Sequence, residues 1–204
     1  GVDDQSIVFD GTLGFAGHAI NILEQYPNSY YVGFDRDTFA IEEATKNCRK
    51  FPNFKAIKAS YSSMLDYATT QNIKLTHILL DLGVSSYQID QSNRGFTFQK
   101  DEPLDMRMDT SASLTAKEVL DSYTKDQLVE LFMVEGDIRS PEKLVERIVE
   151  KRNKDQLNTS FEFLDCIKKS FFFKSRNQYI ATATKLFQAI RVEVNNEMAE
   201  LKKI

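Results

Sequence analysis

Cysteine is scarce in this chain of 204 residues, which contains only Cys48 and Cys166. Each lies in an amphipathic helical pattern, and the two do not have the spacing of metal ligands. Two cysteines of this kind are most simply buried thiols in a reducing compartment. We therefore expect no metal site.

Long apolar runs, a signal-peptide pattern, internal repeats and low-complexity tracts are also absent from the sequence. These absences predict a soluble cytoplasmic protein. A strong charge is missing too, since the formal net charge is −4 and the sequence pI is about 5.3. No overall basic field is present to attract nucleic acid, although a local basic face is enough for binding. The hydrophobic content of 42% allows one substantial core and a smaller second one.

The sequence does contain a glycine-bearing loop at residues 10–18 (DGTLGFAGH). An apolar run at residues 6–9 predicts a buried strand before the loop, and apolar residues from Ile20 to Tyr26 follow helical spacing. Strand, glycine turn and helix form the local architecture of a nucleotide-type cofactor site, because glycines let a ligand approach the free N–H groups of the helix. The glycines recur every third residue, which differs from the dinucleotide fingerprint, so the loop alone is a weak signal.

A second buried strand is predicted at Tyr30–Asp35, and it ends in a carboxylate. In doubly wound folds, an acidic residue at this point binds the hydroxyl groups of a ribose. The alternative is that Asp35 caps the next helix, which begins near Asp37 and Thr38. Asp37 fills the capping role better, so we favour ribose binding by Asp35.

Two further strands are expected at residues 56–59 and 77–80. The third strand ends at Ser60 and Tyr61, and the fourth ends at residues 81–86 (DLGVSS). Helical patterns separate the four strands, which is typical of an α/β protein with a parallel sheet. Because the carboxyl ends of parallel strands share one edge, the polar residues there predict a single ligand crevice.

The strand rhythm stops after residue 86, and a mainly helical insertion is expected from there to residue 180. Capping residues and proline predict helix starts at Thr124, at Ser140 with Pro141, and at Asn158 with Thr159. Residues 184–204 have the pattern of a long amphipathic helix that returns to the sheet domain. We therefore divide the chain into a core, residues 1–86 and 181–204, and an insertion, residues 87–180.

Six blocks of the sequence closely resemble the bacterial-type small-subunit (16S) ribosomal RNA cytosine-N4 methyltransferase family. They occur in the family's order and are DGTLGFAGH at 10–18, FDRD at 34–37, DLGVSSYQ at 81–88, RGFTF at 94–98, PLDMRMD at 103–109 and ATKLFQAIRVEVN at 183–195. The resemblance implies a methyltransferase that uses S-adenosyl-L-methionine, with a Rossmann-like core and a helical insertion that serves as the RNA substrate domain. It also implies small-subunit ribosomal RNA, or the assembled small ribosomal subunit, as partner. Mitochondrial relatives share the blocks, so a eukaryotic source would imply a mitochondrial location.

The same resemblance implies a set of cofactor-binding residues. They are Ala16, Gly17 and His18 in the loop, Asp35 at the ribose, Tyr61 and Asp81 near the adenine, and Gln88 as the residue that closes the site. The family usually has a glycine where this chain has Ala16. A methyl group disfavours a positive φ, so we expect a tighter loop or a more weakly held cofactor. His18 is alternatively an ordinary residue of the helix start.

The implied reaction transfers a methyl group to the exocyclic N4 of a cytidine in the decoding region, by in-line displacement at a sulfonium-bound carbon. N4 is a poor nucleophile because its lone pair is delocalised into the ring, so an acceptor beside it would help. Asp81 is the first catalytic candidate, although cofactor binding accounts for it at least as well. Asp105 and Asp109 either line the substrate side or brace their loop with a salt bridge. Ser85 and Ser86 either contact the base or form a hydroxyl-bonded turn.

Two segments are candidates for the RNA surface. Lys143, Arg147 and Lys151 follow one helical face, but glutamates lie beside them, which favours a solvated, salt-bridged face. Residues 168–176 (KKSFFFKSR) mix cations that can bind phosphates with rings that can stack on an unpaired base. Packing into the core of the insertion accounts for this segment equally well. A target base in structured RNA must be exposed or flipped out to reach a pocket.

Two other functions stay open: methyl transfer to another RNA base, and a non-catalytic or weakly active role in RNA binding or ribosome assembly. The chain starts almost on its first strand and stops after the long helix. We therefore expect a fragment or a natural truncation with an incomplete sheet, whose activity in isolation is in question. An open sheet edge and an uncovered apolar helix face favour association with another chain, of which a homodimer is one form.

Overall fold

The computed structural model describes all 204 residues and divides them into two compact units. We call Gly1–Gly83 together with Met198–Ile204 the sheet unit, and Val84–Glu197 the helical unit. The predicted boundaries, 86/87 and 180/181, therefore move to 83/84 and 197/198. The second shift is the larger one, and it follows from the packing of one long helix.

The sheet unit has the parallel α/β fold that the sequence predicts. Its elements are β1 (Ile7–Asp10), α1 (Gly17–Gln25), β2 (Tyr30–Asp35), α2 (Thr38–Asn47), β3 (Phe54–Lys58), a 3₁₀ turn (Tyr61–Ser63), α3 (Met64–Thr70) and β4 (His77–Leu79). All three strand pairs are parallel, and the strand order is β3-β2-β1-β4. The Rossmann-like α/β class is thus confirmed, with β1 and β2 in the middle of the sheet.

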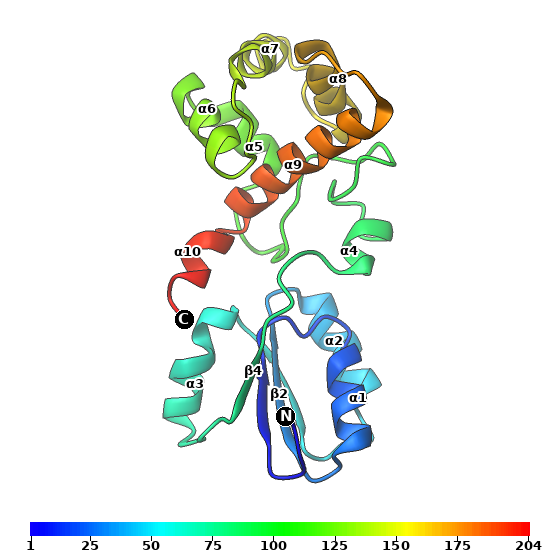
Figure 1. Ribbon diagram of the computed structural model, residues 1–204, viewed down its shortest axis with the longest axis vertical. Coiled ribbons are helices and arrows are strands. Elements are labelled where there is room, and N and C mark those ends of the chain that lie inside the picture. Colours follow the sequence, from blue (N-terminus) through cyan, green and yellow to red (C-terminus); the bar gives the residue numbers. More distant parts are fainter. The chain divides into compact units, whose positions relative to one another are not determined.

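Helices cover both faces of this sheet, with α1 and α2 on one side and α3 on the other (Figure 1). Successive residues of a strand point to opposite faces, and here both kinds are apolar. Val8 and Tyr31 pack with α1 and α2, whereas Phe9, Val32 and the aromatic ring of Phe34 pack with α3. Burial on both faces explains why the strands are continuous apolar runs rather than alternating ones.

The helical unit is built from short helices with strong start signals. Its helices are α4 (Ser86–Asp90), α5 (Ala116–Ser122), α6 (Lys125–Val134), α7 (Glu142–Arg152), α8 (Ser160–Ser170) and α9 (Arg176–Val194), followed by α10 (Glu197–Leu201), of which only Glu197 belongs to this unit. Thr124 and Thr159 cap α6 and α8 as predicted, each in a reciprocal capping box. Pro141 is the N-cap residue of α7, whereas the sequence predicted it to be the first residue of that helix.

The long C-terminal helix differs most from its prediction. Instead of spanning 184–204, α9 begins at Arg176 and ends at Val194. Asn196 has a positive φ of 51°, which breaks the helix before α10. Phe187 and Ile190 of α9 are buried in the same apolar cluster as Phe163 of α8, so the helix belongs to the helical unit. Amphipathic spacing revealed that α9 has a buried face, but not which unit would bury it.

None of these helices is both long and apolar enough to span a membrane.

Candidate functional site

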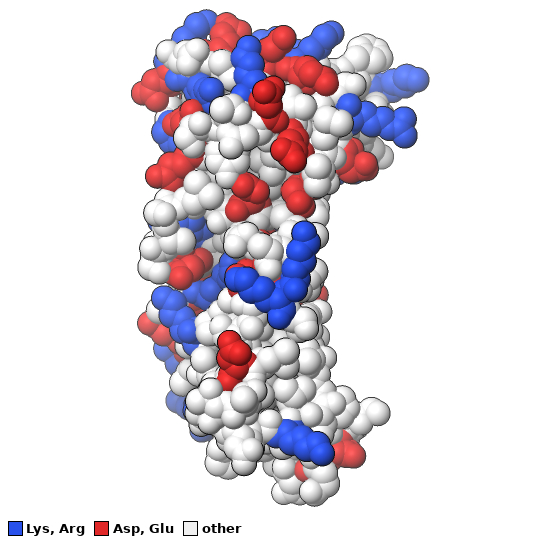
Figure 2. All heavy atoms as spheres, turned by 90° about the vertical axis from the view of Figure 1, so that its left-hand side faces the viewer, with Lys and Arg blue, Asp and Glu red and all other residues white.

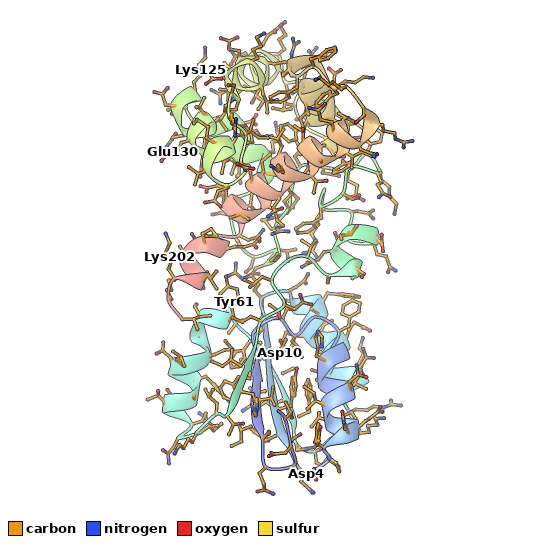
Figure 3. The ribbon with its side chains drawn as sticks, viewed as in Figure 1. Asp4, Asp10, Tyr61, Lys125, Glu130 and Lys202 are labelled. Atoms are coloured by element: carbon orange, nitrogen blue, oxygen red, sulfur yellow. The ribbon has the colours of Figure 1, made fainter.

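The carboxyl ends of the four strands lie at one edge of the sheet unit. Asp10 ends β1, Asp35 ends β2, Tyr61 follows β3, and Asp81 follows β4. Figure 3 shows Asp10 and Tyr61 near this end of the strands, whereas Asp4 lies at the opposite end. The predicted cofactor residues of the sheet unit therefore share the edge where ligands bind in open α/β sheets.

Asp10 is the buried anchor of the glycine loop. Its side chain is fully buried and accepts hydrogen bonds from the Tyr31 hydroxyl (2.7 Å) and the Thr12 backbone N–H (2.9 Å). Desolvation by burial raises the pKa of this carboxyl, although the bonds from Tyr31 and Thr12 oppose the rise. Sequence reasoning did not assign Asp10 to the site; the signal was its place as the first polar residue after the apolar strand.

Asp35 ties the second strand to the loop. Its Oδ2 accepts a hydrogen bond from the Gly14 N–H (2.9 Å), and its Oδ1 accepts one from the Asp37 N–H (2.9 Å). Burial raises its pKa. Asp37, not Asp35, caps α2 by accepting from the Phe39 N–H. Each of these two bonds uses one lone pair of an oxygen, so the Asp35 carboxylate keeps acceptor capacity for a ligand.

The start of α1 is open in a way that suits an anionic or polar ligand. Ala16 is its N-cap residue in the left-handed conformation (φ 67°), and no side chain caps the helix. A Cβ added to Gly14, which has a φ of 51°, or to Gly17 would meet no heavy atom within 4 Å. Uncapped N–H groups beside open space are what a nucleotide-type cofactor uses at a helix start, so the loop fits such a group.

Asp81 and His18 border the same loop. The Asp81 N–H donates to the Thr12 hydroxyl (2.8 Å), and its carboxylate lies 3.7 Å from His18 Nε2, with both side chains exposed. Tyr61, by contrast, is buried, and a Cβ on Gly11 would lie only 2.5 Å from Tyr61 Cβ. Asp81 and His18 are thus accessible to a ligand, while Tyr61 packs beneath the loop.

In the helical unit, Asp105 and Asp109 brace their own loop. Arg107 holds Asp105 through paired contacts, Nε to Oδ1 (2.9 Å) and Nη2 to Oδ2 (2.7 Å), and Arg107 also donates to the carbonyls of Thr110 and Ala112. Burial tends to raise the pKa of Asp105, but the hydrogen bonds from Arg107 outweigh it and lower the pKa. The loop-bracing alternative is therefore present, and a catalytic role for Asp105 stays a prediction.

Gln88 and Ser85 form the cap of α4. The Ser85 hydroxyl accepts from the Gln88 N–H (3.2 Å), and Gln88 Oε1 accepts from the Ser85 N–H (3.0 Å). The hydroxyl-bonded turn predicted as one alternative for Ser85 is thus formed, with Ser86 as the first helical residue. Gln88 is buried and belongs to the helical unit, so its role in closing the cofactor site stays a prediction.

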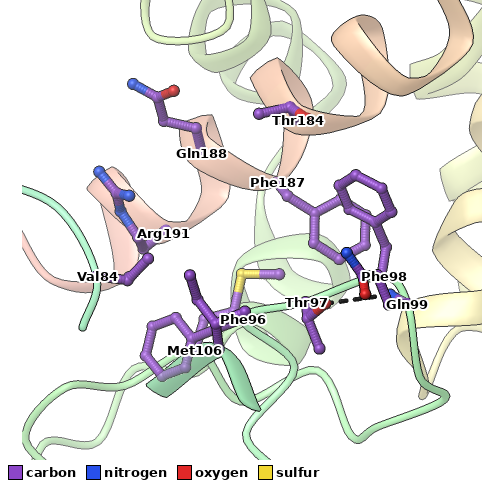
Figure 4. Close-up of a pocket in the computed structure, with 11 residues that line it drawn as sticks. Val84, Phe96, Thr97, Phe98, Gln99, Met106, Thr184, Phe187, Gln188 and Arg191 are labelled. Atoms are coloured by element: carbon purple, nitrogen blue, oxygen red, sulfur yellow. Dashed lines mark hydrogen bonds between the residues drawn. The ribbon is translucent and has the colours of Figure 1, made fainter. Parts of the chain in front are cut away.

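An aromatic pocket of about 230 Å³ lies within the helical unit (Figure 4). Phe187, Gln188 and Arg191 enter it from α9, and Phe96 and Phe98 face them from the preceding loop. The rings of Phe98 and Phe187 lie 5.2 Å apart at 63°. These residues belong to the family blocks at 94–98 and 183–195, to which the sequence assigned no site. Their convergence comes from tertiary packing, which spacing along the chain does not reveal.

The charged face of α7 is neutralised in part. Lys151 pairs with Asp165 of α8 (3.5 Å), and Lys154 pairs with Glu150 (2.8 Å). Cations and carboxylates of the helical unit lie interspersed on the face shown in Figure 2. The salt-bridged alternative is therefore present at Lys151 only, because Lys143 and Arg147 have no carboxylate within ion-pair distance and Arg147 Nε is buried without a hydrogen-bond partner.

The sheet unit, with a glycine loop and acidic strand ends at one edge, defines a Rossmann-like α/β protein with a nucleotide-type cofactor site. A comparison of the sequence with family models goes further. The model of the MraW methylase family matches residues 2–204, and the chain belongs to that family.

Curated relatives agree with this assignment, and those compared here are each named ribosomal RNA small subunit methyltransferase H. The chain is 36% identical to the protein of Persephonella marina, over 96% of this chain and 67% of the relative. It is 37% identical to that of Sulfurihydrogenibium azorense (95% and 66%) and 37% identical to that of Helicobacter hepaticus (98% and 63%). The chain thus spans about two thirds of the length of these relatives.

Proposed function

We propose that this chain is part of an S-adenosyl-L-methionine-dependent methyltransferase that modifies N4 of a cytidine in the decoding region of small-subunit ribosomal RNA. The observation that carries the proposal is the open glycine loop, bonded to Asp35, in a chain of the MraW methylase family. The names of the relatives support the RNA substrate.

Different residues of the sheet unit would bind different parts of the cofactor. The N–H groups at the start of α1, from Gly17 and His18, would bind its carboxylate, and Asp35 would accept from the ribose hydroxyls. Asp81 is accessible beside the loop, and Tyr61 would support the adenine. The cofactor supplies a methyl group activated by a sulfonium, so the protein has to align the acceptor nitrogen and receive its proton.

Asp81 is the residue we propose beside the attacking nitrogen. A carboxylate that accepts a hydrogen bond from the N4 amine holds the amine in line with the methyl group. The same bond raises the electron density on N4, which makes the nitrogen a better nucleophile. Transfer of the methyl group would require N4 to give up one proton, which Asp81 would accept or relay to water. Both oxygens of Asp105 are engaged by Arg107, which makes Asp105 the weaker candidate.

We propose that the aromatic pocket of the helical unit binds an unpaired base of the RNA. Flipped bases are commonly held by stacking on aromatic rings and by hydrogen bonds to their polar edge. Phe96 and Phe98 supply rings, and Gln188 supplies an amide with both donors and an acceptor. This assignment explains why four of the family blocks contribute to one pocket.

A methyl-transfer assay tests the proposal. The chain is incubated with labelled S-adenosyl-L-methionine and small ribosomal subunits that lack the modification, and the labelled nucleoside is identified by mass spectrometry. We expect N4-methylcytidine at one position, and a loss of about 100-fold or more in rate for Asp81→Asn. The control is Asp66→Asn, which changes an exposed carboxylate on α3. The assignment would be overturned by label in another nucleoside. It would also be overturned if the chain binds the cofactor but transfers no label.

Two features of the proposal concern partners and location. The substrate would be the ribosomal RNA itself or the assembled small subunit, and parallel assays with each distinguish them. We keep the cytoplasm as the expected site of action. A homodimer stays a prediction, which sedimentation of the purified chain tests.

A further inference from the structure

The segment from α8 to α9 has an unusual charge pattern. Between Asp165 and Glu193 the sequence contains no Asp or Glu, although the chain as a whole is acidic, with a net charge of −4. The same segment carries six cations, which are Lys168, Lys169, Lys174, Arg176, Lys185 and Arg191. A local positive field is therefore built into a protein that lacks one overall.

Half of these cations are neutralised by partners from outside the segment. Lys169 pairs with Asp165 (2.8 Å), Lys185 with Asp137 (2.6 Å), and Arg191 with Glu197 (2.9 Å). The other three, Lys168, Lys174 and Arg176, are exposed and have no carboxylate within ion-pair distance. The unpaired charge is thus concentrated at the connection between α8 and α9.

Three consecutive phenylalanines occupy that connection, and the middle one points outward. Phe171 and Phe173 pack against the helical core, with ring centroids 6.1 Å apart, and Phe173 also contacts Tyr179 at 5.2 Å. Phe172 is 84% exposed, the most exposed of the large apolar side chains. Core packing, one alternative for residues 168–176, is therefore present at two rings, while the RNA surface stays a prediction that the exposed ring of Phe172 leaves open.

The backbone around Phe172 is braced on both sides. Before it, the Ser170 hydroxyl donates to the Cys166 carbonyl (2.7 Å). After it, the Lys174 N–H donates to Gln178 Oε1 (2.9 Å), and the Ser175 hydroxyl accepts from the Gln178 N–H (3.2 Å). The backbone that carries the ring and the unpaired cations is thus ordered before any partner binds, which lowers the entropic cost of binding.

A groove of about 380 Å³, lined by both apolar and polar residues, adjoins this connection. Phe171 and Gln178 line it, together with Arg139 and Lys185. Asp137 also lines the groove and pairs with Lys185, so the groove adds Arg139 to the cations around Phe172.

We propose that residues 168–176 and the adjoining groove contact a single-stranded segment of RNA, with Phe172 stacked on an unpaired base and Lys168, Lys174 and Arg176 on phosphates. An aromatic ring surrounded by unpaired cations matches a chain that alternates flat bases with anionic phosphates. The inference rests on the proposed function, because it takes ribosomal RNA as the substrate. It adds a contact outside both the cofactor loop and the aromatic pocket.

Binding of a labelled RNA oligonucleotide to the full chain, measured by fluorescence anisotropy, tests this inference. Phe172→Ala is expected to weaken binding of an unstructured pyrimidine-rich 12-mer by about 10-fold, and Phe172→Tyr to restore it, because tyrosine also stacks. Replacing Lys168, Lys174 and Arg176 together with Ala is expected to reduce the slope of log affinity against log salt by about 2. The control is Phe161→Ala, an exposed phenylalanine on α8.

The outcomes separate this inference from the proposed function. Equal affinity of wild type and Phe172→Ala, with the melting temperature unchanged, overturns the stacking role. Equal loss of affinity for a duplex and a single strand overturns it too, since stacking requires an unpaired base. Methyl transfer by wild type is measured in parallel with small ribosomal subunits. If the wild type transfers no methyl group but loses RNA affinity on Phe172→Ala, the RNA contact holds and the proposed function fails.

Discussion

The sheet unit and the helical unit differ in how they use their polar groups. In the helical unit, α4, α5, α6 and α8 each begin with a capping box, although α7 has no side-chain cap, and Arg107 holds both oxygens of Asp105. In the sheet unit, α1 begins without a side-chain cap, and Asp81 is exposed at the end of β4. Polar groups that satisfy one another stabilise a scaffold, whereas groups left open are available to a ligand.

Their cores differ in the same direction. The helical unit has a single cluster of 21 buried apolar residues, whereas the sheet unit has two clusters, of 8 and 6 residues, on opposite faces of the sheet. Strand β4 is also an edge strand, on which Ile78 is 45% exposed. Because buried apolar area dominates stability, we expect the helical unit to be the more stable of the two.

The largest expected effect is the loss of a ring from the helical core. Phe163 is fully buried, and its ring lies 5.3 Å from that of Phe187. Phe163→Ala leaves a cavity and is expected to lower the free energy of unfolding of the helical unit by about 3–5 kcal/mol. Hydrogen exchange resolved by residue measures the loss in each unit separately.

The matched control is Phe161→Ala on the same helix, where the ring is 46% exposed and the expected change is within about 0.5 kcal/mol. Equal destabilisation of both units by Phe163→Ala would show that they unfold together, which contradicts the separation of their cores.

Substitutions at two glycines of the loop should have different effects, one on the stability of the sheet unit and the other on cofactor binding. A Cβ on Gly11 would lie 2.5 Å from Tyr61 Cβ, which no rotation relieves, so Gly11→Ala is expected to cost about 3 kcal/mol. A Cβ on Gly17 meets nothing within 4 Å, so Gly17→Ala leaves stability nearly unchanged while it obstructs the approach of the cofactor. Thermal unfolding and calorimetric titration with S-adenosyl-L-methionine measure the two effects. Undiminished cofactor affinity of Gly17→Ala would argue against a ligand at this loop.

A third prediction concerns how α10 is held in the sheet unit. Glu200 accepts hydrogen bonds from the hydroxyls of Ser60 and Ser62, and Lys203 donates to it at 2.6 Å. Burial tends to raise the pKa of Glu200, but these bonds outweigh it and lower the pKa to about 2. Glu200→Gln is expected to destabilise the sheet unit by about 2 kcal/mol at neutral pH, since hydrogen bonds to a charged group are lost.

The pH dependence of this contribution has a definite sign. The folded-state pKa of Glu200 lies below the unfolded value of 4.5, so its stabilisation is present above about pH 4.5 and is lost as the pH falls toward 2. Thermal unfolding from pH 7 to pH 3 should therefore bring wild type and Glu200→Gln closer together. A constant difference over that range would mean that the charge of Glu200 does not stabilise the unit.

Local signals predicted the sheet unit better than the helical unit. The apolar run at Tyr30–Asp35 predicted β2 residue by residue, and Asp37 was correctly predicted as the α2 cap. The boundary at 197/198 and the aromatic pocket were missed because they depend on which surfaces meet in three dimensions. Helical spacing shows that Phe187 is buried, but it does not show that its neighbour is Phe98. Asp10 was missed because its partner, the Tyr31 hydroxyl, comes from a neighbouring strand.

The smallest expected effect concerns Ala16, where the family resemblance leads us to expect a glycine. Ala16 adopts a φ of 67°, where the Cβ of an L-residue costs about 1–2 kcal/mol, and its side chain is fully buried. Ala16→Gly relieves that strain, but it increases the conformational entropy of the unfolded chain and removes a buried methyl group. The net change in the free energy of unfolding is therefore expected to lie within about 1 kcal/mol of zero. Ala19→Gly, also fully buried on α1 but in helical conformation, gains no such relief and should cost about 1 kcal/mol or more. Urea denaturation of both variants measures the difference, and equal losses would mean that the left-handed backbone at Ala16 carries no strain.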